Sequence, residues 1–143
     1  MQEILKQEHL NQLINTMIQK FLVTDNAEII NSPLAKLSMQ ELKIIVYLGT
    51  FGSDTMSSVA KNLGIPHSTL TNIADRLEKQ VYIGRKQSTQ DRRAYMLFLT
   101  PSGKDLFSLE EKKYFPLSQA MLNALTESEQ DILLVLLSKI VQS

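Results

Sequence analysis

The chain has 143 residues, which is the length of one ordinary domain. Hydrophobic residues make up 43% and charged residues 21%, a globular mixture that excludes a disordered tail and a collagen-like chain. Because cysteine is absent, disulfides, thiol catalysis, thiol redox sensing and thiolate metal sites are excluded too. The two histidines, His9 and His67, leave little for metal binding, although carboxylates could supplement His9; we expect neither a metal nor a cofactor.

Membrane insertion is not expected either. The richest apolar run, residues 132–137, is far shorter than the ~20 residues that a bilayer needs. The first eight residues are acidic and interrupted, unlike a secretory signal. We therefore expect a cytoplasmic protein with no membrane partner.

The net charge of zero conceals a segregation of charge along the chain. Residues 61–104 hold eight basic and three acidic residues, while both flanks are net acidic. All the arginines lie between Arg76 and Arg93. Arginine binds phosphates and guanine edges through paired hydrogen bonds. Charge alone leaves open whether this segment binds nucleic acid or is a solvated basic face.

The amino-terminal part of the chain predicts two helices. Apolar residues at three- and four-residue spacing make the first ~20 residues an amphipathic helix: Leu10, Leu13, Ile14, Met17, Ile18 and Phe21. The pattern lapses over residues 24–33, which predict a loop or a short helical turn. Ser38 and Glu41 form a capping-box signature. The helix that it opens should end near residues 49–52 and bury Leu42, Ile45, Val46 and Leu48.

Two shorter helices follow, joined by a tight turn. Thr55 or Ser57 caps the first, which contains Val59, Ala60 and Leu63 and ends at Gly64. Pro66 starts the second, whose buried stripe consists of Leu70, Ile73, Ala74 and Leu77. Its opposite face presents His67, Ser68, Thr71, Asn72, Asp75, Arg76 and Lys79. This is a helix-turn-helix pattern, although any small helical hairpin shares it.

The remaining third predicts a hairpin and two helices. Residues 82–86 and 94–99 are rich in β-branched and aromatic residues and flank a polar, basic tip. Thr100 and Pro101 open a helix with Leu106, Phe107 and Leu109, which Pro116 should kink or divide. Thr126 and Glu129 form a second capping box before the last helix.

The last helix is apolar over too wide an arc for the surface of a monomer. Either it pairs with the first helix in a dimer interface, or it is buried within one chain. A helix-turn-helix followed by a basic hairpin is a winged helix. We therefore predict a mainly α fold with a small β-hairpin wing: a winged helix-turn-helix at residues 35–104, and a helical dimerisation lobe built from both chain ends, residues 1–34 and 105–143.

Several motifs with matching spacing resemble the MarR family of bacterial regulators over about residues 37–107: His67-Ser68-Thr69-Leu70-Thr71, Leu77-Glu78-Lys79, Asp91-Arg92-Arg93-Ala94 and Leu99-Thr100-Pro101-Ser102-Gly103. The resemblance implies one MarR-like domain over residues 1–143 and a homodimeric regulator of pseudo-palindromic operators in double-stranded DNA. Such regulators often repress and are often released by small aromatic or anionic effectors. Val81 departs from the family's usual glycine, so this turn either differs locally or is strained, and Pro66 replaces a common serine cap, which puts the first-turn geometry in doubt.

The resemblance and the residue chemistry together assign the candidate DNA-binding residues: His67, Ser68, Thr69, Thr71, Asn72, Arg76, Lys79, Arg85, Lys86, Arg92 and Arg93. The small residues at the start of the recognition helix can hydrogen-bond to phosphates or contact thymine methyl groups. Asn72 can pair with adenine, and His67 can donate a hydrogen bond to guanine or to a phosphate. Arg76 and Lys79 suit phosphates. Thr69 can equally be a structural hydroxyl between helices.

In the wing, Arg93 is the candidate for insertion into a minor groove. A carboxylate repels phosphate, so we expect Asp91 to pair with a nearby arginine and to order the tip. Arg85, Lys86 and Arg92 are either phosphate contacts or plain solvated charge.

The sequence offers no catalytic residues, phosphate-binding glycine loop or metal cluster, so we do not expect an enzyme. A winged-helix adaptor for protein contacts, without operator specificity, is the alternative. By resemblance, an effector pocket would lie between the two lobes, where Met17, Phe21 and Tyr47 either face it or are plain core. Activation in place of repression, and a regulator without a ligand, stay open.

Overall fold

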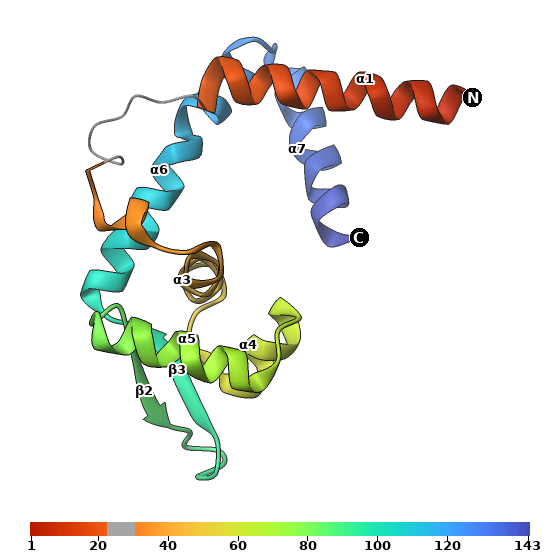
Figure 1. Cartoon of the computed structure of the whole chain (residues 1–143). Helices are drawn as coiled ribbons and strands as arrows, with labels where there is room; N and C mark the ends of the chain where they lie inside the picture. The colour runs from red at the N-terminus through yellow and green to blue at the C-terminus, as the bar shows by residue number, and fades with distance from the viewer. Residues whose placement is uncertain (23–30) are drawn as a thin grey trace. The chain divides into compact units, whose positions relative to one another are not determined.

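The computed structural model describes residues 1–22 and 31–143, so most of the loop predicted at 24–33 lies outside the described residues. The first part comprises α1 (Gln2–Met17), the π-helical turn η1 (Ile18–Leu22), the 3-10 turn η2 (Pro33–Lys36), α3 (Met39–Phe51), β1 (Asp54–Thr55) and α4 (Met56–Leu63) (Figure 1). The second part comprises α5 (His67–Lys79), β2 (Ile83–Gln87), β3 (Tyr95–Leu99), α6 (Pro101–Asn123) and α7 (Glu127–Gln142). The mainly helical fold with a small wing confirms the predicted fold class. None of the described helices combines the length and the apolar character that crossing a membrane requires.

The described residues form two compact units. The end unit consists of residues 1–22 and 112–143, and the central unit consists of residues 31–111. The boundary between them falls within α6.

The capping signals of the sequence all form. The Ser38 Oγ accepts from the Glu41 N–H at 3.1 Å while the Ser38 N–H donates to the Glu41 carboxylate, and Thr126 and Glu129 repeat this box. The Thr100 Oγ1 accepts from the Gly103 N–H at 3.1 Å and starts α6. Of the two outcomes expected at Pro116, a kink or a division, the division is wrong, because α6 runs through Pro116 over 23 residues. A proline removes one hydrogen bond of a helix, and here the neighbouring turns keep the helix continuous.

The sheet has three antiparallel strands in the order β1-β3-β2. The hairpin aligns Ile83 with Leu99 and Arg85 with Leu97, and both Ile83 and Leu97 are buried. The third strand, β1, was not predicted. It contains only two residues, too few for an alternating pattern to be visible in the sequence.

The core lies in the central unit. The stripe predicted on α5 is confirmed: Leu70, Ile73, Ala74 and Leu77 are all buried. On α3 the prediction is partly wrong, because Leu42 and Val46 are only half-buried while Ile44 and Tyr47 are buried with Ile45 and Leu48. Since α3 packs against α4, α5 and β3, it is covered on more than the single face that a simple periodic pattern predicts.

The end unit has no comparable core. Neither α1 nor α7 contains a buried residue, and their large apolar side chains are exposed: Ile4, Leu5, Leu10, Leu13 and Ile14 on α1, and Ile132, Leu134, Val135, Leu136, Leu137, Ile140 and Val141 on α7. The alternative in which the last helix is buried within one chain is therefore wrong.

Candidate nucleic-acid interface

The turn between α4 and α5 is regular. Thr55 caps α4 by accepting from the Ser58 N–H at 3.2 Å. Gly64 ends α4 in the left-handed region, at φ 65°, and the Ile65 N–H donates to the Ala60 carbonyl at 3.1 Å. These bonds form a Schellman motif, for which glycine is the usual residue.

The first turn of α5 is intact although Pro66 provides no side-chain cap. The Leu70 N–H donates to the Pro66 carbonyl at 3.0 Å, so the proline does not distort the entry into the helix. Proline is well suited to this place because it has no N–H of its own to satisfy.

The outer face of α5 carries most of the predicted contacts in exposed positions. His67, Ser68, Asn72, Arg76 and Lys79 are all exposed. Thr69 and Thr71 are half-buried, and the Thr71 hydroxyl donates to the His67 carbonyl at 3.0 Å. The accessible polar groups therefore follow the side of α5 that faces away from its buried stripe.

The carboxyl end of α5 is a second Schellman motif, in which Val81 occupies the glycine position. The Val81 N–H donates to the Glu78 backbone carbonyl at 2.9 Å, and the Tyr82 N–H donates to the Leu77 backbone carbonyl at 3.0 Å. Val81 has φ 65°, so the turn keeps the left-handed geometry and the valine is strained. The Thr100 hydroxyl also donates to the Val81 carbonyl, which ties this turn to the start of α6.

Gly103 allows that junction to close. A Cβ at Gly103 would lie 2.0 Å from the Tyr82 carbonyl oxygen. The first turn of α6 is therefore packed directly against the turn that ends α5.

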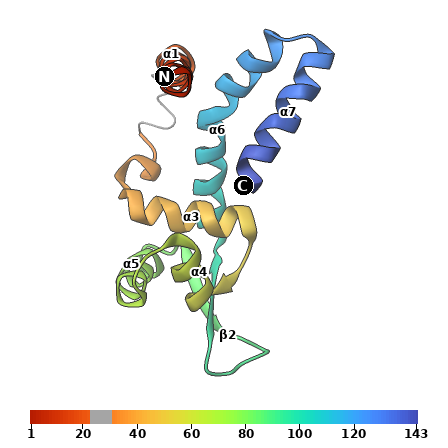
Figure 2. The same ribbon diagram turned by 90° about the vertical axis from the view of Figure 1, so that its right-hand side faces the viewer.

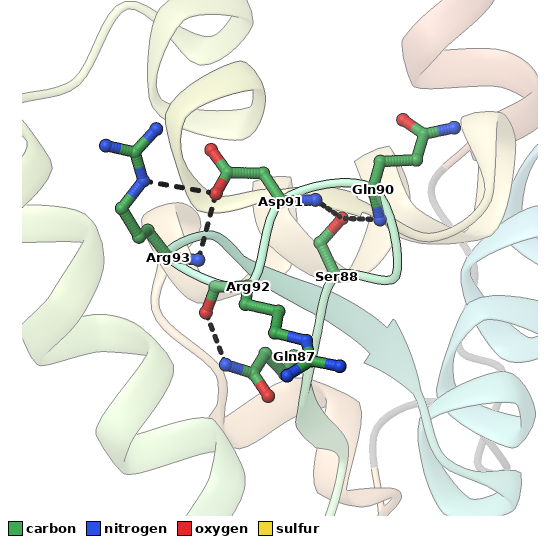
Figure 3. A network of polar contacts seen from close by, with 6 residues as sticks. All are labelled: Gln87, Ser88, Gln90, Asp91, Arg92 and Arg93. Atoms are coloured by element: carbon green, nitrogen blue, oxygen red, sulfur yellow. Dashed lines mark hydrogen bonds and ion pairs between the residues drawn. The ribbon is translucent and has the colours of Figure 1, made fainter.

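The wing projects beyond the helices of the central unit (Figure 2). Its tip is ordered by its own polar groups, seen in Figure 3. Ser88 is buried, and its Oγ accepts from the N–H groups of Gln90 and Asp91 at 3.3 and 3.4 Å. The Gln87 side chain donates to the Arg92 carbonyl across the tip.

Asp91 pairs with Arg93, as predicted. One carboxylate oxygen accepts from both the backbone N–H and the Nε of Arg93, at 3.0 and 3.3 Å. Figure 3 shows that the side-chain bond to Asp91 starts from the Nε of Arg93 and not from its two terminal nitrogens. The Arg93 side chain is 93% exposed. Asp91 therefore binds its Nε while the end of the guanidinium stays accessible to solvent.

The other basic residues of the wing differ from one another. Arg92 is exposed, and Lys86 is exposed with its Nζ 5.5 Å from the centre of the Phe98 ring. Arg85 is half-buried and faces α5, where it pairs with Asp75 and Glu78.

Some of these residues meet around a hollow of about 300 Å³ in the central unit. It is lined by Thr55, Met56, Ser57, His67, Thr71, Arg85, Arg93, Ala94 and Tyr95. Asn72, Arg76 and Lys79 are not among the lining residues. Sequence reasoning missed the contribution of Ser57 and Tyr95, because their approach depends on β1 pairing with the wing.

Tyr47, considered above for an effector pocket, is a satisfied core residue. Its hydroxyl donates to Asp54 at 2.6 Å and accepts from Asn62 at 2.8 Å. The hydrogen bond to the Asp54 carboxylate raises the pKa of Tyr47. Within residues 1–22 and 31–143, no three His, Asp or Glu side chains gather in a way that could hold a metal.

A helix-turn-helix continued by an antiparallel hairpin is a winged helix, and this class is defined by the region from α4 to β3. Residues 37–95 match the MarR family model. An uncharacterised HTH-type transcriptional regulator of Bacillus subtilis, YfiV, is 33% identical over 86 residues, which cover 59% of this chain and 54% of YfiV. The chain thus matches about half the length of that curated relative.

Solved structures match over more of the chain. Streptococcus pneumoniae FabT, in complex with DNA, has a TM-score of 0.71 and 25% identity over 94% of both chains. NadR, in complex with 4-hydroxyphenylacetate, has a TM-score of 0.63 and 25% identity over 92% of this chain and 89% of NadR. Residues 37–95, which contain the helix-turn-helix and most of the wing, are therefore similar to the MarR family of transcriptional regulators.

Proposed function

We propose that this chain is a sequence-specific, DNA-binding transcriptional regulator that acts in the cytoplasm as a homodimer on pseudo-palindromic operators. The observation that carries the proposal is the pairing, in one unit, of an exposed polar face on α5 with a wing whose tip holds an ordered, exposed arginine. The presence of DNA in the FabT structure supports duplex DNA as the partner.

The recognition helix would read bases with its first two turns. Ser68 is exposed, and hydroxyl groups suit phosphates. Asn72 would pair with an adenine edge, and His67 would donate a hydrogen bond to guanine or to a phosphate. Thr69 and Thr71 are half-buried, so their contacts would come from the methyl or hydroxyl edge that stays accessible. Arg76 and Lys79, one turn later, would bind phosphates.

The wing would add contacts beside the major groove. Arg93 would enter a minor groove, where narrow A·T segments concentrate negative potential. Its ion pair with Asp91 leaves the terminal nitrogens available for that contact. Arg92 and Lys86 would bind phosphates at the edges of the groove.

The apolar faces of α1 and α7 would form the dimer. Twelve large apolar side chains are exposed on these two helices, which is the surface expected of an obligate partner interface. A two-fold pair would place its recognition helices about 34 Å apart, in successive major grooves.

Repression relieved by a small aromatic or anionic effector completes the proposal. The 4-hydroxyphenylacetate in the NadR structure supports an effector of this class. The hollow is lined by His67 and Arg93, whose side chains can donate hydrogen bonds to an anion, and an anion there would compete with DNA. The effector would weaken DNA binding by a free energy equal to the difference between its own binding free energies for the free and the DNA-bound protein.

Footprinting on genomic fragments tests the proposal directly, and a gel-shift titration tests its key residue. Affinity should fall steeply with salt because bound cations are released from DNA. Arg93→Ala should weaken binding at least about tenfold, while the matched variant Lys43→Ala, which removes an exposed charge from α3, should leave binding nearly unchanged. Absence of salt-dependent duplex binding would instead favour the adaptor.

A further inference from the structure

Arg85 lies on β2 but its charged group is directed to the recognition helix. Its Nη2 lies 2.5 Å from the Asp75 carboxylate and 3.4 Å from the Thr71 carbonyl oxygen. Its Nε lies 3.3 Å from the Glu78 carboxylate. One guanidinium therefore bridges three groups of α5, spaced by one helical turn on either side of Asp75.

The surroundings of Arg85 favour a role in holding the wing against α5 over direct contact with DNA. Asp75 and Glu78 together carry one more charge than Arg85, so the cluster as a whole repels phosphate. The Arg85 side chain is 26% exposed and its Nε is buried, in contrast to the 93% exposure of Arg93. A phosphate at Arg85 would have to compete with two carboxylates that already lie within 3.3 Å of its guanidinium.

The cluster is a polar link between the wing and α5. Arg85 sits in the middle of β2, opposite Leu97 of β3, and the tip with Arg93 lies beyond it. The tip is ordered within itself by Ser88 and Asp91, but those bonds do not orient it relative to α5. Orientation has to come from the rest of the hairpin, where β1 pairs with β3, Ile83 is buried and the Arg85 ion pairs lie.

We propose that Arg85 is a positioning residue: through Asp75 and Glu78 it fixes the wing against the recognition helix, so that Arg93 and the helix engage DNA at the same time. This inference rests on the proposed DNA-binding function. It assigns Asp75 and Glu78, which bear the same charge as DNA, a favourable role in binding it.

The Asp75→Asn variant distinguishes a positioning role of Arg85 from a phosphate contact, because the two roles predict opposite changes in DNA affinity. If Arg85 were a phosphate ligand, removal of the competing carboxylate would strengthen DNA binding. If Arg85 positions the wing, the loss of its closest partner weakens binding, by about fivefold for a partly exposed ion pair. Asp105→Asn, the same change at an exposed position of α6, is the matched control and should not weaken binding.

A second measurement asks whether the effect acts through the wing. In an Arg93→Ala background the wing has lost its main contact, so Asp75→Asn should cost little there, and the two effects should be non-additive. Full additivity, or tighter binding by Asp75→Asn, would overturn the proposal. Circular dichroism and thermal melting of each variant identify any loss of folding.

A third measurement needs no DNA and so survives failure of the proposed function. The chain has no cysteine, so spin labels can be attached at Lys61→Cys on α4 and Thr89→Cys in the wing, both exposed. Labelled chains diluted with unlabelled chains report the distance between the sites within one chain. Arg85→Gln and Asp75→Asn should broaden that distance distribution, and an unchanged distribution would overturn the positioning role. Failure of the unmodified protein to bind duplex DNA would overturn only the proposed function.

Discussion

The central unit and the end unit solve the problem of burying apolar residues in opposite ways. The central unit encloses Ile44, Ile45, Leu70 and Leu97 completely or almost completely. The end unit has helices of similar length, yet no residue of α1 or α7 is fully buried. Helices that bury no face gain little from packing. The comparison agrees with the proposed dimer, in which the central unit has its core within one chain and a second copy covers the apolar faces of the end unit.

The largest effect is expected from a charge placed on the end unit. Leu134→Asp should prevent dimerisation, because a carboxylate would be buried without a partner in the proposed interface. Operator affinity should then fall at least about 100-fold, since the two half-sites are no longer bound together. Sedimentation and gel shift measure the two effects. Met39→Asp, an equal change at an exposed position of α3, should alter neither, and a dimeric Leu134→Asp protein would refute the interface.

A cavity in the central unit should act differently. Ile45→Ala should lower the free energy of unfolding by about 3 kcal/mol, because Ile45 is fully buried and the core collapses only partly around the gap. Denaturant unfolding measures this loss. It should not depend on protein concentration if the central unit is self-sufficient, whereas the Leu134→Asp loss should.

Val81→Gly should stabilise the central unit by about 1 kcal/mol. It relieves a left-handed valine, and part of that gain is offset by the greater flexibility of glycine in the unfolded chain. Val81 is exposed, so little packing is lost. The reverse change at the equivalent turn, Gly64→Val, is the matched comparison and should destabilise. A Val81→Gly protein that is less stable would mean that valine makes contacts that outweigh the strain.

The smallest effect concerns the first turn of α7. The backbone N–H of Thr126 donates to Glu129 and lowers the pKa of that carboxyl. A carboxyl whose pKa is lowered by folding contributes stability above its unfolded pKa, and that contribution disappears as pH falls through the folded pKa. Helicity of α7 should therefore decrease slightly on acidification, and Glu129→Gln should reduce this pH dependence. Circular dichroism against pH measures it; an equal dependence in the variant would exclude Glu129 as the cause.

Local signals predicted most of the fold. The boxes at Ser38 and Thr126, the glycine at Gly64 and the stripe of α5 each depend on residues within a few positions of one another, so the sequence displays them directly. What could not be predicted depends on long-range contacts. The strand β1 exists only because β3 lies beside it, and the burial of Ile44 and Tyr47 depends on several elements that pack around α3.

The candidate site divides in the same way. The exposed face of α5 and the Asp91–Arg93 pair follow from neighbouring residues and were predictable. The placement of Arg85 was not, because Asp75 lies ten positions away and meets it only when the wing folds back on the helix. A basic residue in a basic segment resembles a DNA contact until its acidic neighbours are known.

The junction built from Val81, Thr100 and Gly103 gives α6 a further property. Its first turn is bonded to the end of the recognition helix, and its last turns belong to the other unit. The Thr100 hydroxyl serves both sides of this junction, because it caps α6 and also holds the left-handed turn after α5. A substitution that removes this hydroxyl would therefore loosen the end of one helix and the beginning of the next at once.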